Sequence, residues 1–455
     1  MPDDGSLTLT TPTAVAPTVL PDRDLQKILV YLGALIMLLA FGAPFGGMID
    51  IPVTFFLKNK LNLSAHEVAG FRLIAAVPLY LSCLFGFARD SWNPFGIKDR
   101  GFMMLFGSVS IVLFLIFACT PVTYATLLGA ILLLTSSFLF ISSAQAGLTS
   151  TIGQQHAASG QVSAVWNIAG SLAAGSALVA GGAVSEWLEP SNVEEAAHIL
   201  FAGAAAIMAL MVAYAAWRPK VVFDHVRAEP GAEAQPLASL GRLLRHRPIY
   251  PALLIWLLWN FAPGATTPLQ FYLQNTLHAT NAEWGQWDGI FTASFVPTFI
   301  AFGLLCRRFT LRTLLVWTTV LAVPQMVPLL FIHSVPGALV AAAAIGLMGG
   351  GATAAYLALL IRSCPEGLQG TTLMMSTGLY FVAARFGDVL GTHLYDHYGG
   401  FSACVVVITI VYALILPALL LVPAGLTATA DGETPASSAM LRGGRRVKKL
   451  ERVQK

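Results

Sequence analysis

The chain has 455 residues, of which 56% are hydrophobic and only 11% are charged, against roughly a quarter charged in an ordinary soluble domain. A mean hydropathy of +0.71 excludes a soluble fold. The net charge of +3 argues against a nucleic-acid binder, and five scattered cysteines form neither a disulfide framework nor a zinc spacing.

The remaining class is an all-α polytopic membrane protein with twelve transmembrane helices, since each crossing needs about 20 mainly apolar residues. Residues 1–26 are polar and lack a signal-peptide core, which predicts a disordered cytoplasmic tail. A central cytoplasmic loop at 218–248 separates a six-helix bundle at 27–217 from another at 249–425, and 426–455 form a basic cytoplasmic tail. The predicted spans are 28–57, 67–88, 101–120, 123–146, 160–183, 197–217, 249–275, 285–306, 311–332, 336–361, 371–392 and 402–425.

Lysine and arginine residues gather on one predicted side of the membrane, in the tails, the central loop and the loops after spans 2, 8 and 10. The other side holds little beyond Lys58 and Lys60. This bias predicts that both termini are cytoplasmic. The expected location of the protein is the plasma (inner) membrane. We interpret the basic tail as an anchor near anionic lipid, with a nucleic-acid site as the alternative.

The two halves share a sequence repeat. The segment Phe55–Gly70 aligns without gaps to Phe271–Gln286. Repeated halves of a transporter meet at the membrane midplane, where interrupted helices point to the binding site. The Gly- and Pro-rich regions Gly46–Pro52 and Pro263–Pro268 are therefore candidate pocket walls, with ordinary helix kinking as the alternative.

Ionisable residues inside the spans are costly unless they face a cavity or a partner. Asp50 and Arg72 lie at similar depth near the outer ends of spans 1 and 2, so they are expected to pair. Asp288 occupies the repeat position that matches Arg72, either in a cavity or in the wet interface. Arg385 and Asp388 lie in span 11.

The functional interpretation places Asp50, Arg385 and Asp388 along a central cavity. There Arg385 could bind a carboxylate or phosphate bidentately, and a buried Asp could load and release protons. Phe381 shares the helical face of Arg385 and Asp388. The alternative is a structural role, with ion pairs between Arg385 and Asp388 or between Asp50 and Arg72.

Several polar or aromatic side chains in apolar helices are further candidate contacts for a flat solute ring, and packing is the alternative for each. No Walker A motif is present, so ATP is not the expected direct energy source, and no cofactor or metal is expected. These further candidates are Trp166, Asn167, Asn260, Gln270 and Tyr356.

The loop between spans 2 and 3 reads GFARDSWNPFGIKDR over residues 86–100. It resembles the major facilitator superfamily signature GxxxD(R/K)xGR(K/R). The spacing from Asp90 to Gly96 is three residues longer than the usual pattern, which resembles the folate–biopterin transporter branch. Residues 362–371 (RSCPEGLQGT) are also similar to that branch's CPxGxE-type segment, but Gln369 stands where an acidic residue is expected.

The superfamily resemblance implies a cytoplasmic gate. Gly86 would allow span 2 to pack closely on span 11, and Asp90 would accept hydrogen bonds from the N-terminus of span 11. Arg100, and with it Lys98, would bridge neighbouring helix ends. In the second half Arg307 stands where the matching aspartate is expected, so an asymmetric gate is predicted.

We therefore expect a secondary active transporter, not an enzyme, that rocks two bundles about a midplane site. The expected partners are a small-molecule substrate, protons and the lipid bilayer, and the chain is expected to act as a monomer without nucleic acid. The branch resemblance implies a flat anionic solute such as a pterin or folate. The alternatives are a non-transporting assembly or pigment-handling factor of the PucC type on the same fold, and a multidrug exporter.

Overall fold

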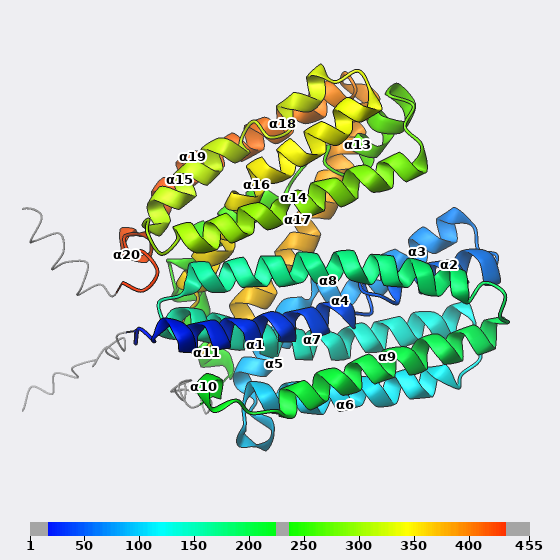
Figure 1. Cartoon of the computed structure of the whole chain (residues 1–455), viewed down its shortest axis with the longest axis horizontal. Coiled ribbons are helices and arrows are strands. Elements are labelled where there is room, and N and C mark those ends of the chain that lie inside the picture. The colour runs from blue at the N-terminus through cyan, green and yellow to red at the C-terminus, as the bar shows by residue number, and fades with distance from the viewer. Residues whose placement is uncertain (1–16, 224–235, 434–455) are drawn as a thin grey trace, which may run out of the picture.

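The computed structural model describes residues 17–223 and 236–433, which form helices joined by turns and are drawn in Figure 1. Within these ranges, ten helices are long and apolar enough to cross a membrane. Two further crossings complete the expected twelve. One is the shorter apolar helix α12 (Ile249–Asn260) with its continuation, and the other is the long, more polar α17 (Gln369–His397).

The first bundle contains six crossings, two of which are built from several consecutive helices. Its elements are α1 (Asp22–Phe41), α2 (Asp50–Phe55), η1 (Phe56–Lys60), α3 (Ala65–Ala75), α4 (Val77–Tyr80), α5 (Ser82–Ser91), η2 (Pro94–Gly96), α6 (Asp99–Ala118), α7 (Tyr124–Gln155), α8 (Ser159–Trp187) and α9 (Val193–Ala216).

The second bundle repeats this plan and is joined to the first through α10 (Lys220–Phe223) and α11 (Pro236–Arg245). After α12 its elements are α13 (Thr267–Phe271), η3 (Tyr272–Thr276), α14 (Asn281–Leu305), α15 (Leu311–Ala322), η4 (Val327–Phe331), α16 (Val335–Ser363), α17, α18 (Phe401–Ala413), α19 (Ile415–Ala418) and η5 (Leu419–Leu421), followed by α20 (Ala424–Thr427).

Both described chain ends lie at one end of the molecule, which we call the terminal end (Figure 1). The main-chain N–H of Thr18 donates to Gln155 O, and that of Gly432 donates to Ala157 O, each at 2.8 Å. We call the other end, where η1 and η3 lie, the distal end. The two bundles lie side by side at the terminal end and diverge toward the distal end (Figure 1).

The predicted tails and loop differ from the structure at their edges. Helix α1 begins at Asp22, inside the tail predicted for 1–26, of which residues 1–16 lie outside the described residues. The loop predicted at 218–248 contains α10 and α11, and 224–235 are outside the described part. The tail predicted from 426 begins with a folded stretch that reaches residue 433, and its basic residues lie beyond the description.

The local structure at the distal end supports the sequence repeat. Each bundle has a π-helical turn, η1 or η3, followed by a residue with positive φ, Asn62 at 52° and His278 at 57°. A capping box then starts the next helix, from Ser64 and Glu67 in one bundle and from a Thr–Glu pair in the other. The same succession at corresponding positions indicates duplicated halves.

The expected helix breaks are present in both bundles. Helices α1 and α12 end before turns that contain Gly46 (φ 74°) and Gly264 (φ 103°). Each break packs against a glycine: a Cβ on Gly181 of α8 would lie 2.5 Å from Met48 O, and one on Gly391 of α17 would lie 2.6 Å from Gly264 N. Because both residues are glycines, the irregular backbone of each break can approach the helix closely.

Candidate functional site

The bundles are fastened together at the terminal end. The helices in contact include α4, α5, α7 and α8 of the first bundle and α14, α16 and α17 of the second. The Ser82 hydroxyl of α5 donates to Met374 O of α17, and the Ser163 hydroxyl of α8 donates to Ala354 O of α16, both at 2.7 Å. These buried bonds join backbone to side chain across the interface.

Helices α5 and α17 approach most closely at Gly86. A Cβ on this residue would lie 2.5 Å from Gly370 O and 2.8 Å from Thr371 Cα. Since these neighbours are backbone atoms, a side chain at this position would push the two helices apart. The close packing expected from the sequence signature is therefore present between the two bundles.

Asp90 binds the N-terminus of α17. Its carboxylate accepts the Thr371 N–H and the Thr371 hydroxyl, both at 2.6 Å, and the Gly370 N–H at 3.2 Å. The negative charge complements the helix dipole. Arg89 Nη1 lies 2.6 Å from Asp90 Oδ1, while its Nε lies 2.5 Å from Asp99 Oδ1. We call this group the Asp90 latch, because it connects a first-bundle carboxylate to a second-bundle helix.

Arg89 is a buried member of this group that the sequence analysis does not single out. It is only 8% exposed, and a Cβ on Gly147 of α7 would lie 2.3 Å from its guanidinium carbon. Glycine at that position therefore makes room for the arginine. The available signal was the basic residue next to Asp90 within the signature, since a buried carboxylate needs a counter-charge.

Arg100 and Lys98 act within the first bundle. Arg100 donates to the last carbonyls of α9, from Nε to Ala215 O at 3.0 Å and from Nη2 to Ala216 O at 2.5 Å. This is the bridge between helix ends that the resemblance implies. Lys98 has a φ of 49°, and its main-chain N–H donates to Asn93 Oδ1 at 2.7 Å, which shapes the turn before α6.

Beyond the terminal end the bundles part. Residues 159–164 of α8 are nearly all buried, but farther along only one side of the helix is covered, at every fourth residue. Helix α17 changes in the same way after Gly378. A Cβ on Gly175 of α8 or Gly289 of α14 would meet no atom within 4 Å. The residues still covered on α8 are Ala169, Ala173, Ala177, Gly181 and Ser185, and those on α17 are Ala383, Gly387 and Gly391.

Arg385 faces the space where the bundles have parted. It lies near the middle of α17 and is exposed. A helical period of 3.6 residues puts it on the side of Met374 and Gly378, which contact the first bundle, and opposite Gly387, which packs on its own bundle. Within the described part of the chain, no ion pair forms at its guanidinium.

Asp388 does not pair with Arg385, so that alternative is wrong. Its carboxylate accepts the Thr266 hydroxyl, the Thr267 hydroxyl at 2.9 Å and the Thr267 N–H at 3.0 Å. These donors belong to the start of α13, so Asp388 holds the helix break of its own bundle and is not oriented as an open cavity group. The charge of Arg385 is consequently not cancelled by its sequence neighbour.

Asp50 and Arg72 do form the expected pair. Arg72 Nη2 lies 3.7 Å from Asp50 Oδ2 and donates to Thr54 Oγ1 at 2.7 Å. The Arg72 side chain is 45% exposed and the Asp50 side chain 21% exposed. The pair lines a small pocket in the first bundle whose other walls include Phe45, Phe71, Ala75 and Ile131.

The softer candidates have separate locations. Trp166 is half-buried and packs against the core. Asn167 donates to Ser163 O at 2.8 Å, one turn beyond the last interface bond of α8. Gln270 is half-buried on α13, and Asp288 is exposed on α14. Among the described residues, no hydrogen bond or ion pair joins any of these four side chains to Arg385.

Tyr356 lies in the core of the second bundle, so its predicted solute contact is wrong. The side chain is 1% exposed. Its hydroxyl lies 2.7 Å from Thr319 Oγ1, and its ring packs edge-on against Trp259 at 5.4 Å. An aromatic residue with a satisfied hydroxyl in a helix rich in small residues is a packing element.

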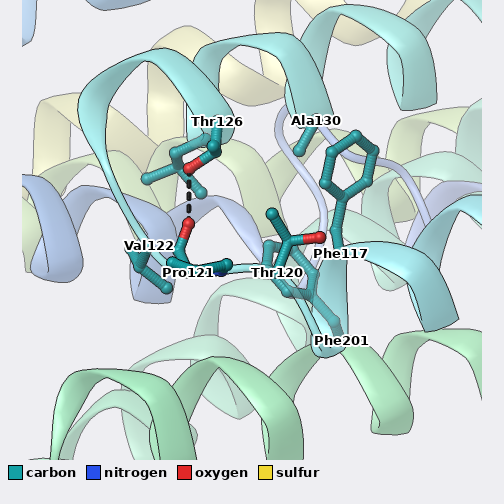
Figure 2. Close-up of a pocket in the computed structure, with 8 residues that line it drawn as sticks. Phe117, Thr120, Pro121, Val122, Thr126, Ala130 and Phe201 are labelled. Carbon is teal, nitrogen blue, oxygen red and sulfur yellow. Dashed lines mark hydrogen bonds between the residues drawn. The ribbon is translucent and has the colours of Figure 1, made fainter.

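A second small pocket lies at the distal end of the first bundle, around the turn between α6 and α7 (Figure 2). Phe117 and Phe201 form apolar walls, and the Thr126 hydroxyl donates to Pro121 O at 2.7 Å. No charged side chain lines it. The pocket is therefore part of the turn's packing and lacks the groups that an anionic solute would require.

Comparisons with known proteins agree with this architecture. The sequence profile of the Major Facilitator Superfamily matches residues 155–387. A folate-biopterin transporter of Synechocystis sp. is 25% identical over 406 residues, which cover 83% of this chain and 79% of the relative. Two solved structures share the fold. They are the transporter FucP in the outward conformation (TM-score 0.64, 14% identity, 87% of this chain and 98% of that one) and the human organic anion transporter MFSD10 (TM-score 0.62, 16% identity, 88% and 100%).

Proposed function

Because the chain belongs to the major facilitator superfamily of multi-pass membrane transporters, we propose that it moves a small organic anion across the membrane by alternating access. The observation that carries this proposal is the asymmetry of the interface. The bundles are latched at the terminal end and parted beyond Ser163 and Gly378. This is one of the two states that a rocking pair of bundles must visit.

The terminal end would face the cytoplasm. Arg89, Arg100, Arg307 and Arg362 lie at this end, whereas Lys58 and Lys60 belong to the distal turn η1. The positive-inside bias supports this orientation in the plasma (inner) membrane. One chain supplies both bundles and the whole interface between them, which supports a monomeric transporter.

Arg385 would bind the anionic group of the solute. It is the arginine on the parted side of α17, and Asp388 is occupied by the start of α13. A guanidinium can hold a carboxylate or phosphate through two parallel hydrogen bonds. Phe381, one turn away on the same helix, offers a ring against which a flat solute could stack. A pterin or folate has this combination of a flat ring and polar groups, and the relationship to a folate-biopterin transporter supports that class.

Asp50 would carry the coupled proton. Its distance of 3.7 Å from Arg72 is too long for a tight charge-assisted hydrogen bond. Arg72 also donates to Thr54, so the ion pair can loosen without leaving the arginine unpartnered. A carboxylate held in this way can be protonated on one side of the membrane and released on the other.

Uptake into proteoliposomes tests the proposal. Three solutes separate the chemical features: folate has a pterin ring and carboxylates, biopterin has the ring without a carboxylate, and p-aminobenzoylglutamate has carboxylates without the ring. We expect saturable uptake of folate, stimulated by a pH gradient, and weaker uptake of the other two.

The Asp50→Asn variant should lose the stimulation by the gradient while it still exchanges solute at equal pH. Lys58→Gln, which changes an exposed distal charge, is the matched control. Folate, biopterin and p-aminobenzoylglutamate all entering at the rate of empty liposomes would contradict the proposed solute class.

A further inference from the structure

The loop after α14 lacks the carboxylate that the repeat leads one to expect. Arg307 occupies that position, and its Nη2 pairs with Asp22 Oδ1 of α1 at 2.5 Å, in an exposed setting. The preceding close approach is retained, because a Cβ on Gly303 would lie 3.0 Å from Ala164 Cβ of α8. The second half of the interface therefore keeps its glycine but not its aspartate.

A carboxylate from elsewhere in the chain fills this place. Asp431, beyond α20, has a side chain with 0% exposure. Its Oδ2 accepts the Gln161 N–H at 2.9 Å, and its Oδ1 lies 3.4 Å from the Ser159 hydroxyl. Both partners belong to the first turn of α8, a helix of 29 residues. Asp431 therefore accepts hydrogen bonds at the start of α8 in the first bundle, as Asp90 does at the start of α17 in the second.

The arginine of the latch is duplicated as well. Arg362, in the last turn of α16, places Nη2 2.8 Å from Asp431 Oδ1 and donates from Nε to the Ser159 hydroxyl at 2.6 Å. Its Nη1 donates to Leu426 O and Thr429 O, both at 3.0 Å. One guanidinium therefore holds the C-terminal segment and the start of α8 together. It pairs with Asp431 as Arg89 pairs with Asp90.

The segment around Asp431 is anchored to both bundles through its backbone. The Asp431 N–H donates to Cys306 O of the second bundle at 2.8 Å. The Gly432 N–H donates to Ala157 O of the first bundle at the same distance, with Gly432 at a φ of 82°. A Cβ on Gly160 would lie 3.0 Å from Asp431 Oδ2 and 2.6 Å from Cys306 Cβ. These contacts cross the interface and cannot all survive when the terminal end opens.

We propose that Asp431 is a positioning residue that closes the terminal end, as the second of two matched carboxylate latches. It replaces the aspartate missing at Arg307 and must release α8 before the bundles can part there. This inference rests on the proposed alternating access. The asymmetry expected from Arg307 would then be offset by the C-terminal segment, so that each bundle contributes one carboxylate to a helix start of the other.

Spin labels on the full chain test the latch without any solute. One label replaces Trp187 at the distal end of α8 and the other replaces Tyr398 just after α17, both exposed. Asp431→Asn should increase the population with the distal ends drawn together by about fivefold to tenfold, the loss typical of one charge-assisted hydrogen-bond partner. Asp90→Asn should give a shift of the same direction and similar size. Glu433→Gln is the matched control, because within the described residues the Glu433 carboxylate bonds to Ala430 N of its own segment and to no other group.

The outcomes are distinct. A distance distribution for Asp431→Asn that matches Glu433→Gln, while Asp90→Asn shifts it, would overturn the inference. If Asp431→Asn fails to accumulate, the double variant Asp431→Asn with Arg362→Gln removes the unpaired buried charge and should show the same shift. A shift in a chain that transports none of the tested solutes would support the latch and count against the proposed solute class alone, since the distances require no uptake.

Discussion

The charged side chains inside the bundles have different roles, and their depth in the membrane predicts only some of their partners. Asp50 and Arg72 form the pair that their matching depth predicts. Arg385 and Asp388 are one turn apart on one helix, yet the Asp388 carboxylate accepts its hydrogen bonds from the start of α13. Because those donors come from a segment more than a hundred residues away, no local pattern could have revealed them.

Arg385 is the residue at which the proposed solute chemistry can be tested most simply. Replacing Arg385 by Ala should weaken the apparent affinity for folate by about tenfold to a hundredfold, since charge-assisted hydrogen bonds contribute roughly 1.5–3 kcal/mol. Arg385→Lys should recover only part, because an ammonium cannot bind bidentately. The measurement is a thermal-shift titration with folate, alongside uptake.

Arg308→Ala is the matched control for this titration, because Arg308 is also exposed but lies at the terminal end after α14. Its apparent affinity should equal that of the unmodified chain. An Arg385→Ala variant with the same affinity as Arg308→Ala would remove Arg385 from the solute site.

At the level of the helices, the sequence predicts the elements well wherever the signal is local. The spans follow from continuous runs of apolar residues, and the closely packed Gly86 follows from its place in the signature at residues 86–100. The signature also led to the partner of Asp90, because the resemblance names span 11. The predicted solute contact of Tyr356 is wrong because the residue is buried. The sequence of an apolar helix does not show whether an aromatic residue packs in a core or lines a cavity.

The long-range features required the structure. Asp431 lies in a stretch that reads as the start of a polar tail, and only its position beside Arg362 and the start of α8 gives it a role. The packing partners of the helix breaks also required the structure, because the sequence gives the position of Gly46 and Gly264 along the chain but not the helices that they pack against.

The contact between α5 and α17 should tolerate no side chain at its closest point. Gly86→Ala would bring a Cβ within 2.5 Å of Gly370 O, and overpacking of this kind costs about 1–3 kcal/mol. We expect a lower melting temperature and a lower uptake rate. Gly203→Ala on α9 is the control, because Gly203 is exposed away from the interface and a Cβ there meets no atom within 4 Å. Equal melting temperatures and uptake for the two variants would contradict the proposed tight seal.

Across the whole molecule, the account requires that the terminal and distal ends open in alternation. Cys306 is a natural reporter of the terminal end, since it is 3% exposed and packs against Gly160 across the interface. Burial and the nearby Asp431 carboxylate raise the pKa of the Cys306 thiol well above its ordinary value, so it should react slowly while that end is closed. Gly175→Cys would report the distal end.

The most direct measurement is the rate at which a water-soluble thiol reagent labels these two positions separately, in chains whose other cysteines are alanine. In the resting protein Cys306 should react slowly and Gly175→Cys rapidly. Adding Asp90→Asn, which lies away from both reporters, should accelerate labelling at Cys306 and slow it at position 175. Rates that rise or fall together at the two ends, or that ignore Asp90→Asn, would contradict alternating access.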